Sequence, residues 1–310
     1  MSIFKMLYGE FDMDKEYLVS DKAFKISSLA VQAMVYEVSC YPSPGLVSCI
    51  SNGAHKDMDY YTFIDSTSVL IKYLTLCVQK GMETGRPEDI FMELKKLGVS
   101  AEKEMYEKTK GVNTHKGMIF LMGTCCGAVG IAVKHNMNFW EIEQIIKNMT
   151  KGITERELSP ILRNKNFIKN GKLFGRKLSY GEKLFLKYNV KGVRGQVEQG
   201  LNLIFDFALG FYKKSKNLNE NDRLVNTLIG IMQFSEDTNI IHRHSLDILK
   251  EVNAKAKHII HLGGMRTDEG RKAIQLLDKE FIYRNISPGG TADLLAITVF
   301  LYLVKQYMSD

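Results

Sequence analysis

Apolar residues recur at intervals of three and four along most of this chain, which is the spacing of helices that bury one face. The interval is clearest in residues 26–34, 70–78, 90–105 and 246–256. Buried strands would need an alternation of period two, and no segment shows a convincing one. Pro87, followed by two acids, and Ser287, followed by Pro-Gly-Gly, mark further helix starts. The sequence therefore predicts an all-α protein, with residues 1–310 in a single multi-helix domain.

Residues 117–133 carry no charge between Lys116 and Lys134. This run is just short of membrane-spanning length and contains four glycines, which favours a helix buried among other helices over a membrane span.

The charge and cysteine patterns restrict the partners and the compartment. The 42 Lys and Arg exceed the 35 Asp and Glu by seven, but no basic stripe interleaved with aromatic residues indicates nucleic-acid binding. The five cysteines form no C-x-x-C pair and are odd in number, which is typical of reduced, buried thiols. Residues 1–17 do not have the pattern of a secretory signal. We therefore expect a cytoplasmic protein.

Residues 154–191 differ from the rest because they are rich in Lys and Arg and have little periodicity. Such a segment either separates two domains or forms a basic, irregular loop over a site, since long loops inside compact domains are often functional. The sequence supports the two interpretations equally, and within a single domain the segment would be the loop over the site.

Five polar segments, each containing glycine or a cluster of ionisable residues, interrupt the apolar helices. These motif segments are residues 44–59, 109–117, 191–198, 237–244 and 287–293. None matches a P-loop or a dinucleotide-binding glycine pattern. Each is a weak signal alone, but five in one helical protein indicate a shared site.

The first motif segment places His55, Asp57 and Asp59 at alternate positions, so an extended loop would direct all three to one side. Carboxylates placed in this way can hold Mg²⁺ or accept a hydroxyl proton. The alternative is that Asp57 or Asp59 caps a helix. Asp293, in the fifth segment, suits a metal or a ribose hydroxyl, or it compensates a helix dipole.

The other motif segments suit an anion. The second offers Asn113, His115 and Lys116 at the start of the uncharged helix, where a helix N-terminus attracts negative charge. The third flanks Arg194 with glycines, and the fifth presents the backbone amides of a Gly-Gly turn. Solvated helix caps and a surface arginine are the alternative interpretation.

Taken together, PSPGLV, NGAHKDMD, GVNTHKG, GVRGQ, DTN with a following HR, and SPGGTADLLA resemble the triphosphoribosyl-dephospho-CoA synthase family, from about Tyr36 to Leu303. The resemblance implies a largely helical enzyme that converts ATP and 3′-dephospho-CoA to 2′-(5″-triphosphoribosyl)-3′-dephospho-CoA and adenine. It also implies that the product passes to a holo-acyl-carrier-protein synthase, or transferase, of citrate lyase, or serves malonate decarboxylase.

That reaction needs a carboxylate near the ribose C1 or the incoming hydroxyl, a proton donor to adenine, and cations for the phosphates. The candidate catalytic residues are His55, Asp57, His115 and Asp237. The candidate substrate-binding residues are Asn113, Lys116, Arg194, Glu198, Arg243, Gly289 and Gly290. The candidate ligands for a Mg²⁺ ion bound with ATP are Asp59 and Asp293.

The chain departs from the family pattern at four places. Ser43, Ser48 and Gln196 stand where the family usually has Lys, Asp and Glu, and His244-Ser245 stand in place of a Gly-Gly. These departures indicate a divergent branch or an inactive relative. Besides the transferase, two functions therefore stay open: a non-catalytic nucleotide- or CoA-binding protein, and a helical metal-dependent nucleotide hydrolase.

Overall fold

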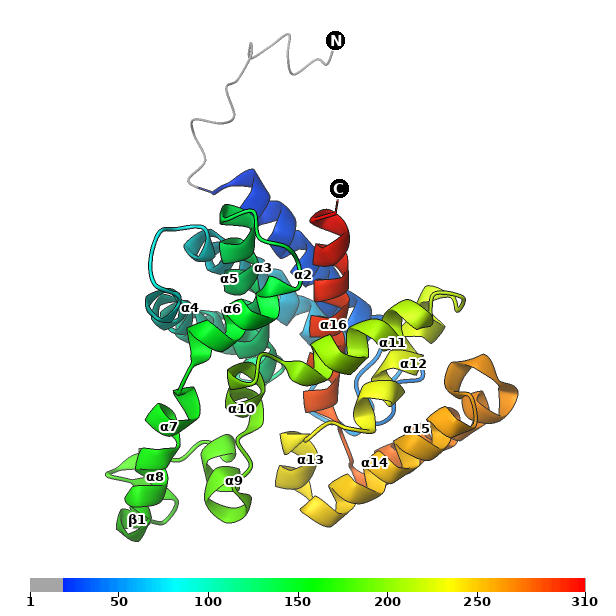
Figure 1. The fold of residues 1–310 in the computed structure, drawn as a ribbon. Helices are drawn as coiled ribbons and strands as arrows, with labels where there is room; N and C mark the ends of the chain where they lie inside the picture. The colour runs from blue at the N-terminus through cyan, green and yellow to red at the C-terminus, as the bar shows by residue number, and fades with distance from the viewer. Residues whose placement is uncertain (1–18, 310) are drawn as a thin grey trace, which may run out of the picture.

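The uncharged run forms helix α5 (Lys116–Lys134), which lies inside a bundle of N-terminal helices in the computed structural model (Figure 1). The structure describes residues 19–309, so the expectation about residues 1–17 concerns a segment outside it. The helices that surround α5 are α2 (Asp21–Ser39), α3 (Tyr60–Gly81), α4 (Pro87–Lys108) and α6 (Glu141–Thr150).

The glycines of α5 explain how closely α3 approaches it. A methyl group on Gly130 would lie 2.2 Å from the carbonyl oxygen of Val78, and one on Gly127 would lie 2.3 Å from Leu94 of α4. Both distances are well inside van der Waals contact, so only glycine allows this packing.

Helix α5 is the one described helix that is long and apolar enough to cross a membrane. The surrounding helices bury 78% of its apolar window, which is the arrangement of a core helix. The prediction of a buried helix over residues 117–133 is confirmed.

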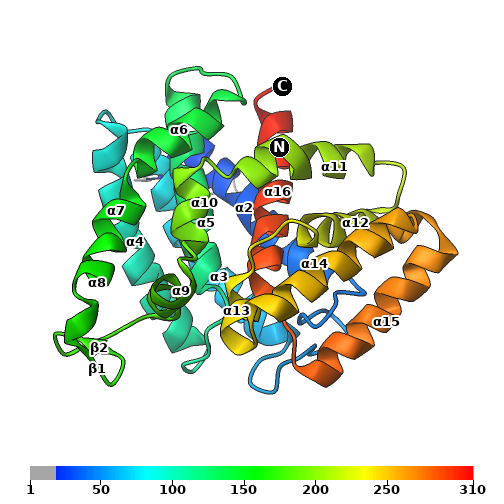
Figure 2. The same ribbon diagram turned by 60° about the horizontal axis from the view of Figure 1, so that its bottom comes forward.

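Helix α16 (Gly289–Tyr307) is the second strongly apolar helix and joins the two halves of the molecule. Figure 1 and Figure 2 show it beside α2, with the N-terminal helices on one side and the C-terminal helices on the other. The C-terminal helices are α11 (Leu209–Lys214), α12 (Glu220–Met232), α13 (Thr238–Arg243), α14 (Leu246–His261) and α15 (Asp268–Arg284). One apolar core runs through both halves, from Ala23 to Val304.

Residues 154–191 fold into a small lobe rather than the irregular segment that their composition predicts. The lobe contains α7 (Ile153–Glu157), α8 (Ser159–Arg163), a 3₁₀ turn (Lys165–Phe167) and α9 (Tyr180–Tyr188). Its three short antiparallel strands are β1 (Ile168–Lys169), β2 (Lys172–Leu173) and β3 (Arg176–Lys177), in the order β1-β2-β3. A separate apolar cluster, Leu158, Ile161, Leu173, Leu178 and Phe185, holds it together.

The lobe leads into α10 (Gly192–Glu198) and then into η2 (Leu203–Ala208), a π-helical segment that continues into α11. Helix α9 lies beside α13, where the rings of Tyr180 and His242 are 3.9 Å apart (Figure 1).

Four of the five thiols are buried as the sequence predicts, and all five are free. Cys49 is the exception, because it lies in the exposed loop of the first motif segment and donates to the carbonyl of Ser39.

Candidate active site

The N-terminal end of α16 is where the motif segments meet. His55 of the first segment lies 2.8 Å from Ser287 Oγ of the fifth through its Nε2 atom. Asp237 of the fourth accepts a 2.7 Å hydrogen bond from the backbone N–H of Thr291 in α16. The third segment is next to the fourth, since a methyl group on Gly192 would lie 3.2 Å from Thr238.

The second motif segment reaches the same place through α5. A methyl group on Gly117, the second residue of α5, would lie 2.4 Å from Oδ2 of Asp293. Residues from all five segments are therefore neighbours around the first two turns of α16, as Figure 2 allows the reader to follow.

The backbone conformation at Gly45 brings the first motif segment into contact with the residues just before the fifth. Gly45 has φ +70°, and a methyl group there would lie 2.0 Å from the carbonyl oxygen of Ile286. Only glycine combines that left-handed conformation with so close an approach. The Gly45 N–H donates to Asp278 of α15 at 3.0 Å, which fixes the loop against the C-terminal half.

Asp237 is a buried carboxylate whose oxygens are fully engaged. Oδ1 accepts from the N–H groups of Asn239 and Ile240, and Oδ2 accepts from both the N–H and the hydroxyl of Thr291. It thereby caps α13 and α16 together, where Pro288 supplies no side-chain cap for α16. Burial raises its pKa, although these hydrogen bonds act in the opposite direction. This geometry indicates that Asp237 positions the two helices and does not act as a catalytic base.

Glu37, on α2, is a site residue that the motif analysis missed. It is 5% exposed, and its carboxyl group has no hydrogen-bond partner within residues 19–309. Burial raises its pKa to about 8, so the group holds its proton at neutral pH. A signal was present in the sequence, since Glu37 continues the apolar stripe of Ala30, Ala33 and Met34 at helical spacing.

Asp293 is a second carboxyl group of this site that has no hydrogen-bond partner in the described part of the chain. The residue is partly exposed, and its Oδ2 lies against Gly117 of α5. Burial raises its pKa well above the ordinary value, and the negative charges of Glu37 and Asp237 raise it further. Strongly perturbed pKa values of this kind cluster at functional sites. We call Glu37 and Asp293 the carboxyl pair.

In the first motif segment, the side chains of His55 and Asp57 come together. His55 Nδ1 lies 3.7 Å from Asp57, whose side chain is 65% exposed, and 3.5 Å from the guanidinium of Arg243. Burial, followed by the charge of Arg243, lowers the pKa of His55. Asp59 caps α3 in a capping box with Thr62, which is the helix-capping alternative that the sequence left open for it.

The second segment contributes a neutral histidine. His115 is buried, its Nδ1 lies 2.6 Å from Ser66 Oγ, and burial lowers its pKa to about 3. Asn113 accepts from the N–H of Lys116. The Lys116 ammonium, half exposed, pairs with Glu102 at 2.7 Å.

The candidate residues of the third segment are engaged with the small lobe. Arg194 Nε donates to Glu157 of α7 at 2.6 Å, and Glu198 accepts from Thr154. Of the three predicted phosphate-binding cations, only Arg243 is both exposed and without a carboxylate partner among residues 19–309.

The described residues contain no group of three or more His, Cys, Asp or Glu side chains arranged to hold a metal ion. The two predicted metal ligands differ in their surroundings, because Asp59 is used in a helix cap and Asp293 belongs to the carboxyl pair.

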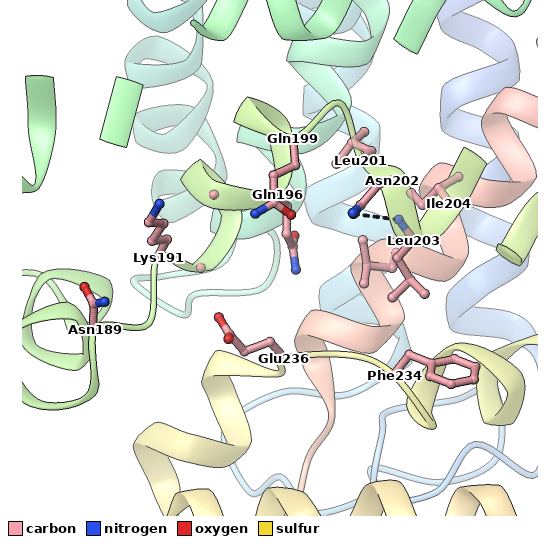
Figure 3. Close-up of a pocket in the computed structure, with 13 residues that line it drawn as sticks. Asn189, Lys191, Gln196, Gln199, Leu201, Asn202, Leu203, Ile204, Phe234 and Glu236 are labelled. Carbon is pink, nitrogen blue, oxygen red and sulfur yellow. Dashed lines mark hydrogen bonds between the residues drawn. The ribbon is translucent and has the colours of Figure 1, made fainter. Parts of the chain in front are cut away.

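A pocket of about 270 Å³ opens beside this site, between α10, the start of η2 and residues 234–236 (Figure 3). Its lining includes Leu294 of α16 and Glu236, the residue before Asp237.

We expect Gly117→Ala to lower the free energy of unfolding by about 1–3 kcal/mol, because the added methyl group would overlap the Asp293 carboxyl. The matched control is Gly210→Ala in α11, where a methyl group meets nothing within 4 Å. That change should stabilise by up to about 1 kcal/mol through helix propensity. Urea unfolding measures both, and equal effects would contradict the close contact at Gly117.

Comparisons with known proteins agree on one family. The family model for ATP:dephospho-CoA triphosphoribosyl transferase (CitG) matches residues 23–310. A Malonomonas rubra protein named probable 2-(5″-triphosphoribosyl)-3′-dephosphocoenzyme-A synthase is 36% identical over 94% of this chain and 90% of its own length. A protein of the same name from Lactiplantibacillus plantarum is 34% identical over 90% of this chain and 97% of its own length.

Protein CitXG from Leuconostoc mesenteroides subsp. cremoris is 38% identical over 96% of this chain, which spans 62% of that longer relative. No solved structure shows significant similarity to this chain. The family that the motif segments predicted is thus confirmed over nearly the whole sequence: this chain belongs to the ATP:dephospho-CoA triphosphoribosyl transferase family.

Proposed function

We propose that the N-terminal end of α16 is where this chain carries out its family's reaction, the transfer of a triphosphoribosyl group from ATP to 3′-dephospho-CoA. In this reaction the bond from the ribose C1 of ATP to adenine breaks, and a bond from C1 to the 2′-hydroxyl oxygen of dephospho-CoA forms. The departing adenine needs a proton, and the hydroxyl loses one. The site must therefore both give and accept a proton.

The carboxyl pair is the observation that carries the proposal. A carboxyl group that is still protonated at neutral pH can donate its proton to the departing base, and the carboxylate that this leaves behind can then accept the hydroxyl proton. After one turnover the pair holds the same number of protons as before. A carboxylate near C1 also stabilises the positive charge that develops there.

We assign positioning roles to the polar groups around the pair. Asp237 fixes the first turn of α16 through Thr291, and Ser287 fixes His55 beside Arg243. Arg243 is the cation best placed to meet a phosphate group, because it is exposed and has no carboxylate partner among the described residues. Lys116 and Arg194 would have to leave Glu102 and Glu157 to do so.

We propose that Mg²⁺ enters as the ion bound to the triphosphate of ATP, as part of the substrate. The carboxyl groups near the first turns of α16 are few and mainly buried, whereas triphosphate oxygens are themselves good Mg²⁺ ligands. Asp293 is the site carboxyl that could contact such an ion once ionised.

We further propose that the product passes to a holo-acyl-carrier-protein synthase or transferase of citrate lyase, and that the reaction takes place in the cytoplasm. The relative named CitXG supports a link to a CitX activity, because this chain matches only part of that longer protein. The five free thiols agree with a reducing compartment.

The test is release of adenine, followed chromatographically, from purified protein with ATP and Mg²⁺. We expect adenine only when 3′-dephospho-CoA is also present, in equal amount to the triphosphoribosyl product. Adenine or phosphate release without dephospho-CoA would identify a hydrolase. Binding of both nucleotides in calorimetry with no adenine release would identify a non-catalytic relative.

A further inference from the structure

The pocket between α10 and η2 reaches the first turns of α16 but contains neither member of the carboxyl pair. Leu294, which lines it, follows Asp293 in α16, and Glu236 precedes the Asp237 cap. A ligand in the pocket would therefore contact the same two segments that carry Asp293 and Asp237. At about 270 Å³ the pocket has room for a planar heterocycle with part of an attached sugar.

The walls of the pocket suit a flat, apolar ligand. Gly192 and Gly195 form part of one wall, where a methyl group on Gly192 would meet Thr238 and one on Gly195 would meet Lys191. Leu203, Leu294 and Phe234 supply apolar surface (Figure 3). Phe234 is 56% exposed and is held edge-on by Phe207, with ring centroids 4.9 Å apart. An exposed aromatic ring held in this way is a good stacking partner.

Two side-chain amides supply polar groups to the lining of the pocket. Gln196 lies on α10 and Gln199 is the C-cap residue that follows this helix, and Figure 3 shows their side chains in the same part of the pocket. Neither side chain has a hydrogen-bond partner within residues 19–309, whereas the Asn202 side-chain oxygen accepts from the N–H of Leu203 at 2.9 Å. A free carboxamide offers a donor and an acceptor side by side, which is the pattern that pairs with the amine and a ring nitrogen of adenine.

The backbone of the pocket is held in uncommon conformations. Gly200 and Leu201 both have positive φ, +77° and +60°, and the π-helical turn η2 begins two residues later. A left-handed leucine is strained, and π-helical turns are found mostly at functional sites. Here the strain ends α10 abruptly and places Leu203 against the pocket.

We propose that this pocket binds an adenine base. The inference rests on the proposed function, in which both substrates carry adenine and free adenine is a product. Charge excludes a phosphate group as the main ligand, because Lys191 is the only cationic residue lining the described pocket and Glu236 opposes it. Both substrates contain adenine, so the experiment must distinguish which of the two the pocket binds.

The probe is free adenine, titrated into the full chain by calorimetry, with hypoxanthine as the base that has a carbonyl in place of the amine. Adenine should bind about tenfold more tightly than hypoxanthine, and Gln196→Leu should weaken adenine binding about tenfold or more. The matched control is Gln144→Leu on α6, an exposed glutamine that bonds Asn148 outside the pocket. A second variant, Leu203→Trp, fills the pocket and should also abolish adenine binding if Gln196→Leu fails to fold.

Steady-state kinetics then identify which adenine the pocket holds. A rise in the KM for ATP alone, with adenine inhibiting competitively against ATP, assigns the departing base. The same pattern for dephospho-CoA assigns the retained base. If the wild-type chain releases adenine normally but the folded variants leave adenine affinity and both KM values unchanged, the pocket proposal is wrong and the proposed function stands. If the wild-type chain binds adenine in the pocket but never releases it from ATP, the proposed function fails instead.

Discussion

Asp293→Asn should lower kcat for adenine release by about 10²–10⁴-fold, because an amide can neither donate the proton that adenine needs nor accept one from the hydroxyl. ATP affinity, measured by calorimetry, should change little, since the lost interaction belongs to the transition state. The shape of the side chain is preserved, so the contact of Asp293 with Gly117 need not change.

The matched control for that variant is Asp247→Asn on α14, whose side chain is 89% exposed and contacts Lys250. Its kcat should equal that of the wild-type chain. Wild-type turnover in Asp293→Asn would remove the carboxyl pair from the mechanism. A large loss of ATP affinity with unchanged kcat would make Asp293 a binding residue instead.

Glu37→Gln should remove a pH dependence from the stability of the folded chain. The pKa of Glu37 rises from 4.5, the value of an ordinary glutamate in water, to about 8 in the fold. Between these values the native state binds more protons than the unfolded state, so the free energy of unfolding falls as pH rises. The slope from this one group is at most about 1.4 kcal/mol per pH unit.

The variant and the wild-type chain should therefore be equally stable near pH 4, where Glu37 is protonated in both the folded and the unfolded chain. At pH 8.5 Glu37→Gln should be the more stable by on the order of 2–4 kcal/mol, while being almost inactive at every pH. Urea unfolding from pH 4 to 8.5 measures the effect, with Glu107→Gln, an exposed change on α4, as the control. Parallel stability curves for the wild-type chain and Glu37→Gln would show that Glu37 ionises normally.

The helices could be predicted from the sequence because their apolar spacing is strong and local. Pro87 begins α4 as expected, and the uncharged run becomes the buried helix α5. The small lobe could not be predicted, because its five-residue apolar cluster comes from short elements with no sustained period. The few apolar residues that hold the lobe together are dispersed among many lysines and arginines, so they form no recognisable pattern in the sequence.

The candidate site was predictable as a set of segments, but its inner residues were not. Glu37 lies outside the glycine-containing motifs, and its importance comes from burial by α16, which is distant in sequence. Asp237 was expected to act on the substrate, yet the fold uses its oxygens to cap two helices. Which groups a carboxylate meets depends on tertiary packing, so chemical type and spacing alone do not determine them.

Helix α16, the last described helix, packs against α2, the first described one, and thereby brings Asp293 to Glu37. During synthesis the N-terminal bundle can form early, but the carboxyl pair does not exist until α16 has left the ribosome. Contacts so distant in sequence also form late in folding, since the loop between them must close first. If the carboxyl pair carries out the proposed chemistry, a chain without α16 should therefore release no adenine from ATP.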